Sequence, residues 1–226
     1  MTNLAKYAIA AALTAASLTA EHATAAEMEA TYNVNFNGTW STRTHPKEYP
    51  AGAHFSGLIG ATHGAGYVLF KSGAKATPGL KKLSETGKHS PLNAEIRAAI
   101  AAGKAGSLIA SGPVFNLPRN VTTKFKVTRA FPMVSLVAMI APSPDWFAGV
   151  SSVALMRNGV WVKSRTITVY AWDAGTDDGT TYKAANKAST PHRAIALNKA
   201  PHFMMRGKRV AVGTITFTRV DQPVTN

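Results

Sequence analysis

Short runs in which apolar and polar residues alternate are the feature that most limits the fold of this chain. Tyr32, Val34 and Phe36 alternate with polar residues and are followed by Asn37 and Gly38, which indicates a half-buried strand that ends in a turn. Further apolar runs predict strands at about 123–127, 133–140, 153–156, 167–170 and 209–219. Strands in this number, separated by turn signals, favour an all-β fold built as an antiparallel β-sandwich.

The last predicted strand changes phase in its middle. Val210 and Val212 face one side, whereas Ile215 and Phe217 are out of phase with them across Gly213. A bulge at Gly213 would account for the change, because one extra residue moves the following side chains to the other face.

Two short helices are predicted as insertions between strands. Thr77 and Pro78 provide an N-terminal cap and a first-turn proline, and Gly87 marks the end of the first helix. The second helix runs from Pro91 to Gly103, with apolar residues at every fourth position.

The segment 41–66 interrupts the strand pattern with prolines, glycines and histidines. It also carries Tyr49, Phe55, Leu58 and Ile59, and large apolar side chains hold a loop against a core. We therefore expect a long ordered loop rather than a linker.

Residues 1–25 have the composition of a signal peptide. A basic start ends at Lys6, an apolar stretch follows at 7–20, and small residues precede Glu27. The rival interpretation is a membrane anchor, but this alanine-rich stretch is shorter than the roughly 20 residues that a spanning helix needs.

Export is therefore the first functional expectation. We expect one domain at 27–220, a flexible tail at 221–226 and no transmembrane segment in the mature chain, which would be secreted or periplasmic. The chain has no cysteine, so its stability must come from packing, from hydrogen bonds or from a bound metal ion, and this suits a bacterial source.

The net charge of +14 bears on the choice of partner. Such a charge would ordinarily indicate nucleic acid, but the basic residues are scattered, with only pairs such as Lys81-Lys82 and Lys208-Arg209. An anionic cell-surface component, such as lipopolysaccharide or an acidic glycan, fits an exported protein better than a specific nucleic acid. A cationic surface without a specific partner is the alternative, and the oligomeric state stays open.

Four of the five aspartates lie in two loops that each follow a predicted strand: Asp145 in the first, and Asp173, Asp177 and Asp178 in the second. Converging carboxylates repel each other and raise their own pKa values, and a cation removes that cost. Hard oxygen ligands favour calcium, whose coordination backbone carbonyls and water would complete. Ordinary capped turns, in which the carboxylates accept hydrogen bonds from nearby amides, explain the same spacing equally well.

The two acidic loops also resemble a known family. The segments SPDWFAGV (143–150) and DAGTDDG (173–179) closely resemble the two most distinctive motifs of the spondin N-terminal domain family, found in F-spondin and mindin. Earlier segments agree in the same order, namely 36–41, 45–50, 54–63, 79–87 and 132–135. The resemblance covers roughly 32–218.

This resemblance implies a C2-like β-sandwich and a calcium site in which Asp145, Asp173 and Asp177 are the metal ligands. It also implies a role in binding or adhesion without catalysis, because animal members act at the cell surface and in the matrix. Two positions depart from the family pattern. Lys126 stands where mindin has a glutamate of the metal site, so an anionic ligand would be lost or a cation gained. Met156 replaces a cysteine of the animal domains.

Motifs for catalysis are missing from the sequence. The seven histidines include no HExxH pair, and the chain has neither a G-x-S-x-G elbow nor a dinucleotide-binding glycine loop. We expect His54 and His63 to be hydrogen-bonded structural residues, and Trp146 and Phe147 to be buried. A metal-dependent hydrolase that uses Asp178 or a histidine as its base remains an alternative function, as does a self-assembling surface or matrix subunit.

Overall fold

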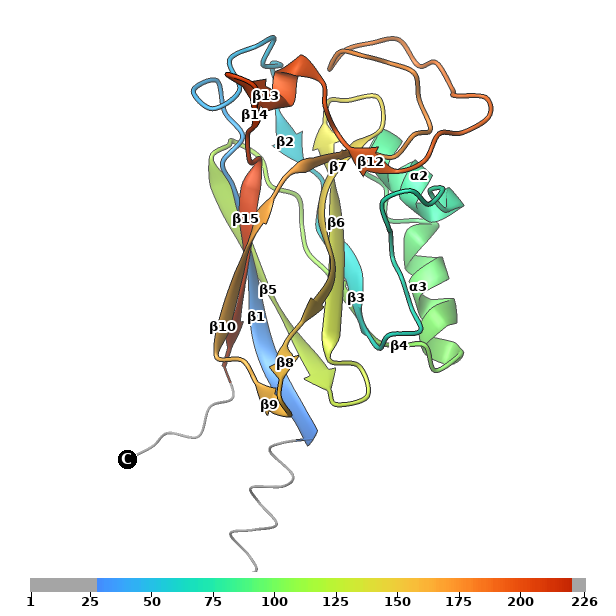
Figure 1. The fold of residues 1–226 in the computed structure, drawn as a ribbon, viewed down its shortest axis with the longest axis vertical. Coiled ribbons are helices and arrows are strands. Elements are labelled where there is room, and N and C mark those ends of the chain that lie inside the picture. Colours follow the sequence, from blue (N-terminus) through green and yellow to red (C-terminus); the bar gives the residue numbers. More distant parts are fainter. Residues whose placement is uncertain (1–27, 221–226) are drawn as a thin grey trace, which may run out of the picture.

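The structure is a computed structural model that describes residues 28–220. The predicted signal peptide (1–25) and the predicted flexible tail (221–226) lie outside the described residues. Two antiparallel sheets pack face to face, and two helices lie outside the second sheet (Figure 1). The predicted β-sandwich with two short inserted helices is therefore confirmed. Within the described residues, no helix combines the length and the apolar character needed to cross a membrane.

The first sheet has four strands in the order β10-β15-β1-β5. Their bounds are β1 Glu29–Gly38, β5 Arg119–Thr128, β10 Ser164–Val169 and β15 Gly213–Arg219. The predicted alternation of buried and exposed residues in β1 is confirmed, since Tyr32, Val34 and Phe36 are fully buried and the residues between them are partly exposed. The start of β1 pairs with the ends of β5 and β15, as in the pair of Tyr32 with Arg219.

The second sheet runs in the order β12-β11-β7-β6-β3-β4, and β2 also pairs with β6. Its strands are β2 His54–Phe55, β3 Ile59–His63, β4 Ala105–Ala110, β6 Met133–Ala141, β7 Trp146–Ala154, β11 Ala171–Asp173 and β12 Ala196–Leu197. Two small hairpins complete the strands, β8 Met156–Arg157 with β9 Val160–Trp161 and β13 Met204–Met205 with β14 Lys208–Arg209. A short 3-10 helix, η1 Pro201–Phe203, precedes β13.

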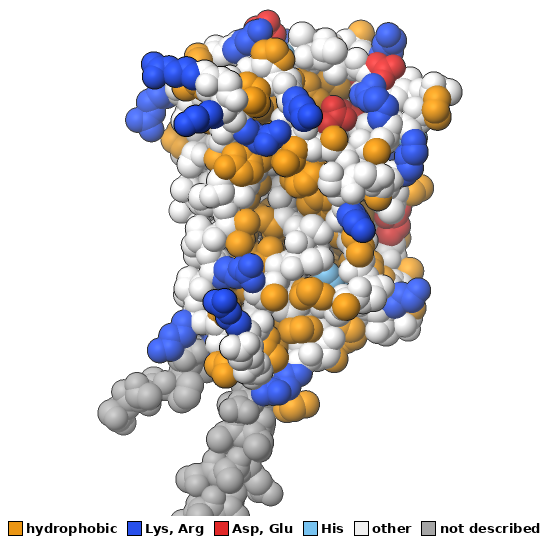
Figure 2. Space-filling view, in the orientation of Figure 1, with side chains coloured by type: hydrophobic (Ala, Val, Ile, Leu, Met, Phe, Trp, Pro, Cys, Tyr) orange, Lys and Arg blue, Asp and Glu red, His pale blue; other side chains and the backbone are white. Residues whose placement is uncertain are grey.

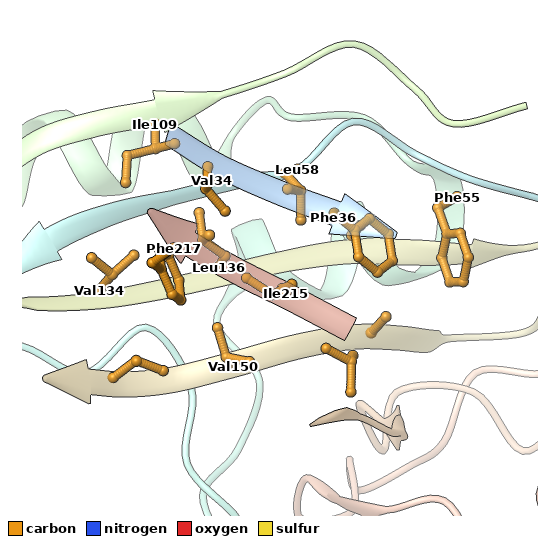
Figure 3. Close-up of a cluster of buried hydrophobic side chains, with 14 of the residues drawn as sticks. Val34, Phe36, Phe55, Leu58, Ile109, Val134, Leu136, Val150, Ile215 and Phe217 are labelled. Carbon is orange, nitrogen blue, oxygen red and sulfur yellow. The ribbon is translucent and has the colours of Figure 1, made fainter. Parts of the chain in front are cut away.

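The main core lies between the two sheets. Figure 3 shows Val34 and Phe36 of β1 and Phe217 of β15 in the same cluster as Leu136 of β6 and Val150 of β7. Each of these side chains is at most 5% exposed. Burial of apolar surface on this scale is the main stabilising term for a chain without disulfides.

The helices α2 (Pro78–Thr86) and α3 (Leu92–Ala101) cover the other face of the second sheet. The Thr77 side chain accepts a hydrogen bond from the backbone N–H of Leu80, and Gly87 ends α2 in the left-handed conformation, as the sequence predicts. Leu80 and Leu83 of α2 pack in a second core cluster with Phe147 of β7.

The prediction of a long loop at 41–66 is wrong in part, because this segment contains β2 and β3. All five residues of β3 are buried, so the strand lacks the alternation that reveals a half-exposed strand. Gly60 lies so close to β6 that a Cβ atom there would be 1.9 Å from the carbonyl oxygen of Ser135. The sequence pattern also fails to predict the strand β4.

Several predicted strand boundaries are wrong as well, and in two cases the strand itself is divided or extended. The strand predicted at 153–156 begins at Trp146, because β7 contains Gly149 and two serines that weaken its apolar pattern. The strand predicted at 209–219 is divided: β14 ends at Arg209 and β15 begins at Gly213. The phase change therefore separates a hairpin from a strand, and no bulge is needed to explain it.

Candidate functional site

Two loops at one end of the second sheet carry Asp145, Asp177 and Asp178, and Asp173 is the last residue of the strand before the second loop (Figure 1). The first loop joins β6 to β7 and contains Asp145. The second loop, 174–195, joins β11 to β12 and follows directly on Asp173. Since β7 and β11 are neighbours and Asp173 pairs with Trp146, the sheet itself brings the two loops together.

Asp145 joins the first loop to the second. The residue is fully buried. Its Oδ2 accepts hydrogen bonds from the backbone N–H groups of Thr176 at 2.7 Å and Asp177 at 3.1 Å. Its backbone carbonyl accepts a further bond from the N–H of Ala174. Its Oδ1 is also buried but has no hydrogen-bonding partner among the described residues, which is costly for a charged oxygen.

Asp173 and Asp177 shape the second loop from within. Asp173 Oδ1 accepts a bond from the N–H of Gly175 at 2.8 Å, while its Oδ2 accepts no hydrogen bond from residues 28–220. Asp177 uses both carboxylate oxygens, Oδ1 for the N–H of Gly179 at 2.7 Å and Oδ2 for the N–H of Lys187 at 2.9 Å. Both predicted explanations thus have a counterpart here: capped turns at Asp177, and free carboxylate oxygens at the other two residues.

Arg193 is the residue of this region that the sequence did not reveal. Its guanidinium forms an ion pair with Asp178 and donates a hydrogen bond to the carbonyl of Asp177 at 2.8 Å. It also lies 3.9 Å from Asp173 Oδ1. The only sequence signal was a base in the same loop as the acids, which is weak in a chain with 25 lysines and arginines.

The electrostatic environment gives these carboxyl groups different pKa values. Burial and, next, the negative charge of Asp173 raise the pKa of Asp145 to about 6, against the lowering effect of the two N–H donors. Burial also raises the pKa of Asp173. By contrast, the hydrogen bond from Ser189 and the charge of Arg193 lower the pKa of Asp178.

The free oxygens of Asp145 and Asp173 are the donor set that fits a hard cation. A buried carboxylate oxygen without a partner, beside a second carboxylate, is stabilised by a positive charge. Among residues 28–220, however, no three His, Asp or Glu side chains are close enough to hold a metal ion by themselves. A calcium ion at this position would draw most of its ligands from backbone carbonyls and water.

Lys126 does not take the place expected from the family pattern. It lies on β5 opposite Thr31, near the start of β1, and its ammonium group is 2.8 Å from Glu29. The start of β1 and the β6–β7 loop are at opposite ends of the sandwich (Figure 1). The expectation that Lys126 acts at the acidic loops is therefore wrong, because the strand carries it away from them.

The aromatic and histidine residues are structural, as predicted. Trp146 is 1% exposed and Phe147 is fully buried. His63 is also buried and shares a hydrogen bond with Ser135 at 2.8 Å. His54 shares one with the carbonyl of Gly52.

Comparison with known proteins gives a family and its relatives. The Spondin_N family profile matches residues 30–203. Spondin-1 of Homo sapiens is 36% identical over 172 residues, which is 74% of this chain and 21% of that protein. Spondin-2 of Homo sapiens is 34% identical over 170 residues, or 74% of this chain and 51% of that protein. The chain thus spans about a fifth of Spondin-1 and about half of Spondin-2.

Proposed function

Because this chain belongs to the Spondin_N family, as its motifs predicted, we propose that it is an exported recognition or adhesion domain without catalytic activity. In this proposal the acidic loops bind calcium, and the basic surface binds an anionic cell-surface or matrix ligand. The domain would act in the periplasm or outside the cell.

The observation that carries the calcium proposal is the unpartnered, buried Oδ1 of Asp145. Asp145 and Asp173 would supply charged ligands, and Asp177 would keep the loop in the shape that presents its carbonyls, or would itself be a third ligand. Bound calcium would neutralise the acidic loops and join them more firmly.

The test is calcium-dependent thermal stability. Excess calcium should raise the Tm of the wild type relative to EDTA, because a ligand that binds only the folded state stabilises it. The double variant Asp145→Asn, Asp173→Asn should show no such rise. A control pair with the same charge change outside these loops, Glu29→Gln and Glu85→Gln, should keep it. The calcium proposal fails if EDTA leaves the wild-type Tm unchanged.

The anionic ligand is supported by charge. The chain carries a net charge of +14, and Figure 2 shows many Lys and Arg side chains and few acidic ones on one face. Binding to lipopolysaccharide or an acidic polysaccharide should weaken as salt is added, since exposed charges are screened beyond about 10 Å at 0.1 M ionic strength. Binding that is indifferent to salt would count against this surface.

Asp178 is poorly suited to the base of a hydrolase. Its carboxylate forms an ion pair with Arg193 and accepts a hydrogen bond from Ser189 at 2.7 Å. Both contacts stabilise the ionised form and lower its pKa, which makes it a weak proton acceptor near neutral pH.

A further inference from the structure

An apolar groove lies on the open side of the sandwich, between β7 and β10. Its volume is about 280 Å³, and its lining includes Val150, Val153, Ile167, Tyr170, Trp172 and Leu197. Figure 2 shows hydrophobic side chains gathered down the middle of this face, with Lys and Arg side chains above and below them. The volume suits a few amino-acid side chains, since pockets for drug-sized molecules start at about 300 Å³.

The groove exists because β11 is too short to cover β7. The strand β7 pairs with β6 along its length, but with β11 only at 146–148. Between β10 and β11 a single residue, Tyr170, takes the chain from the first sheet to the second. Along 149–154, the second edge of β7 therefore has no neighbouring strand among the described residues.

The strand β7 is irregular where it pairs with β6. The β6–β7 register shifts between Val134 and Leu136, and Ser152 has a φ of 54°. The N–H of Ser152 binds the Ser135 hydroxyl at 2.8 Å. Such a bulge increases the local twist of the strand and limits how far a regular ladder can run along it. An edge beside an apolar groove is the arrangement by which proteins take up an extended peptide as an added strand.

Two arginines flank the groove. Arg165 donates a hydrogen bond to the carbonyl of Ala154 at one end of β7. Arg209 lies over the Tyr170 ring at 6.0 Å and donates to the carbonyl of Asn198 at 3.5 Å. Within residues 28–220, neither guanidinium forms an ion pair with a carboxylate. The groove therefore combines an apolar floor with positive charge on its borders.

We propose that this groove binds an extended peptide segment of a partner protein, with alternating apolar residues and an acidic residue at each end. The peptide backbone would pair with the free edge of β7, its apolar side chains would enter the groove, and its carboxylates would reach Arg165 and Arg209. A second copy of this chain fits less well, because the arginines of both copies would meet. An acyl chain would leave the β7 backbone unpaired.

Synthetic peptides test this proposal. The probe is acetyl-Asp-Val-Thr-Val-Thr-Val-Asp-amide with a fluorescent label, titrated with the full chain in EDTA so that the acidic loops do not contribute. A peptide with lysine at both ends should bind at least about tenfold more weakly, because it would place two positive charges beside the two arginines and lose both charged hydrogen bonds. A peptide with proline for the central valine should lose binding, since proline removes a ladder donor.

Variants locate the site. Arg165→Gln with Arg209→Gln should weaken binding of the acidic probe about tenfold or more. The control pair Lys88→Gln with Lys104→Gln makes the same charge change at exposed positions after α2 and α3, and should change affinity by less than about twofold. Amide hydrogen exchange at 149–154 should slow when the acidic probe binds.

Three results would overturn the proposal. The first is no binding of the acidic probe, or equal binding of the acidic, lysine and proline peptides. The second is a concentration-dependent dimer, seen by sedimentation, that Ile167→Glu abolishes. The third is binding of dodecyl phosphate at the groove without binding of any peptide. Because the assay contains no calcium and no polysaccharide, none of these results bears on the calcium or anionic-ligand proposals.

Discussion

If the acidic loops bind calcium as proposed, the buried carboxyl of Asp145 links that binding to its own protonation. Its pKa is raised to about 6, chiefly by burial, so near pH 6 about half of the calcium-free molecules carry a proton there. Calcium requires the ionised form, and binding must displace this proton.

Calcium affinity should therefore fall as the pH drops through 6. Titration calorimetry in two buffers of different ionisation enthalpy should show proton release near pH 6 and almost none at pH 8. Asp145→Asn should abolish this proton release. Asp178→Asn makes the same replacement at a carboxyl whose pKa is lowered, and should leave the proton release intact. Equal affinity at pH 5 and pH 8 would contradict the role of Asp145.

Without calcium, the same residue affects stability. The folded protein holds the Asp145 proton more tightly than the unfolded chain does. The stabilising contribution of Asp145 to the free energy of unfolding therefore declines as pH rises from about 4 to about 6. His45 acts oppositely: burial lowers its pKa to about 4, so its contribution is lost as pH falls below 6.5.

Comparison with Asp145→Asn isolates the carboxyl, since His45 is present in both proteins. In EDTA, the wild type should lose on the order of 1 to 3 kcal/mol relative to the variant between pH 4 and pH 7. Urea unfolding across this range measures the difference. Parallel pH profiles of the two proteins would show that Asp145 titrates normally.

At the scale of elements, the second loop depends on Arg193. Arg193→Gln removes the ion pair with Asp178 and weakens the bond to the carbonyl of Asp177. The loop should open more often, so limited proteolysis within 180–192 should accelerate severalfold while the Tm falls by only a few degrees. Arg157→Gln, in the β8–β9 hairpin, is a control with the same charge change, and similar cleavage of both variants would contradict the role of Arg193.

The predicted N-terminal cap of the helix α2 can be tested directly. Thr77→Ala removes the acceptor for the N–H of Leu80 and the hydroxyl bond to Glu95, and should lower the free energy of unfolding by about 1 kcal/mol. Chemical denaturation measures the loss. Thr86→Ala, near the end of the same helix, should cost clearly less, and equal losses would mean that the cap contributes little.

Elements with local signals were predictable, and those set by tertiary contacts were not. Alternation revealed β1, and capping residues revealed α2. The strand β3 is buried on both faces and has five residues, so neither length nor period identifies it. In the site, the aspartate spacing predicted both loops. The contact between Arg193 and Asp178 joins residues 15 positions apart, and no local sequence pattern predicts it.

At the scale of the whole molecule, both sheets depend on one core. Leu136 of β6 is fully buried between them, and Leu136→Ala should cost about 2–5 kcal/mol. Tryptophan fluorescence and far-UV circular dichroism should report a single shared transition at a lower denaturant concentration. Two separate transitions would mean that the sheets unfold independently.

The pairing of β1 with β15 also has a mechanical consequence. The start of β1 lies beside the end of β15, so the two ends of the described chain leave the sandwich at the same place, opposite the acidic loops. Tension applied between these ends would separate the strands one residue pair at a time, beginning with Tyr32 and Arg219. Such peeling needs little force, so the domain would yield early if it were pulled in series. Anchored by either end, it would instead hold its acidic loops outward without carrying any load.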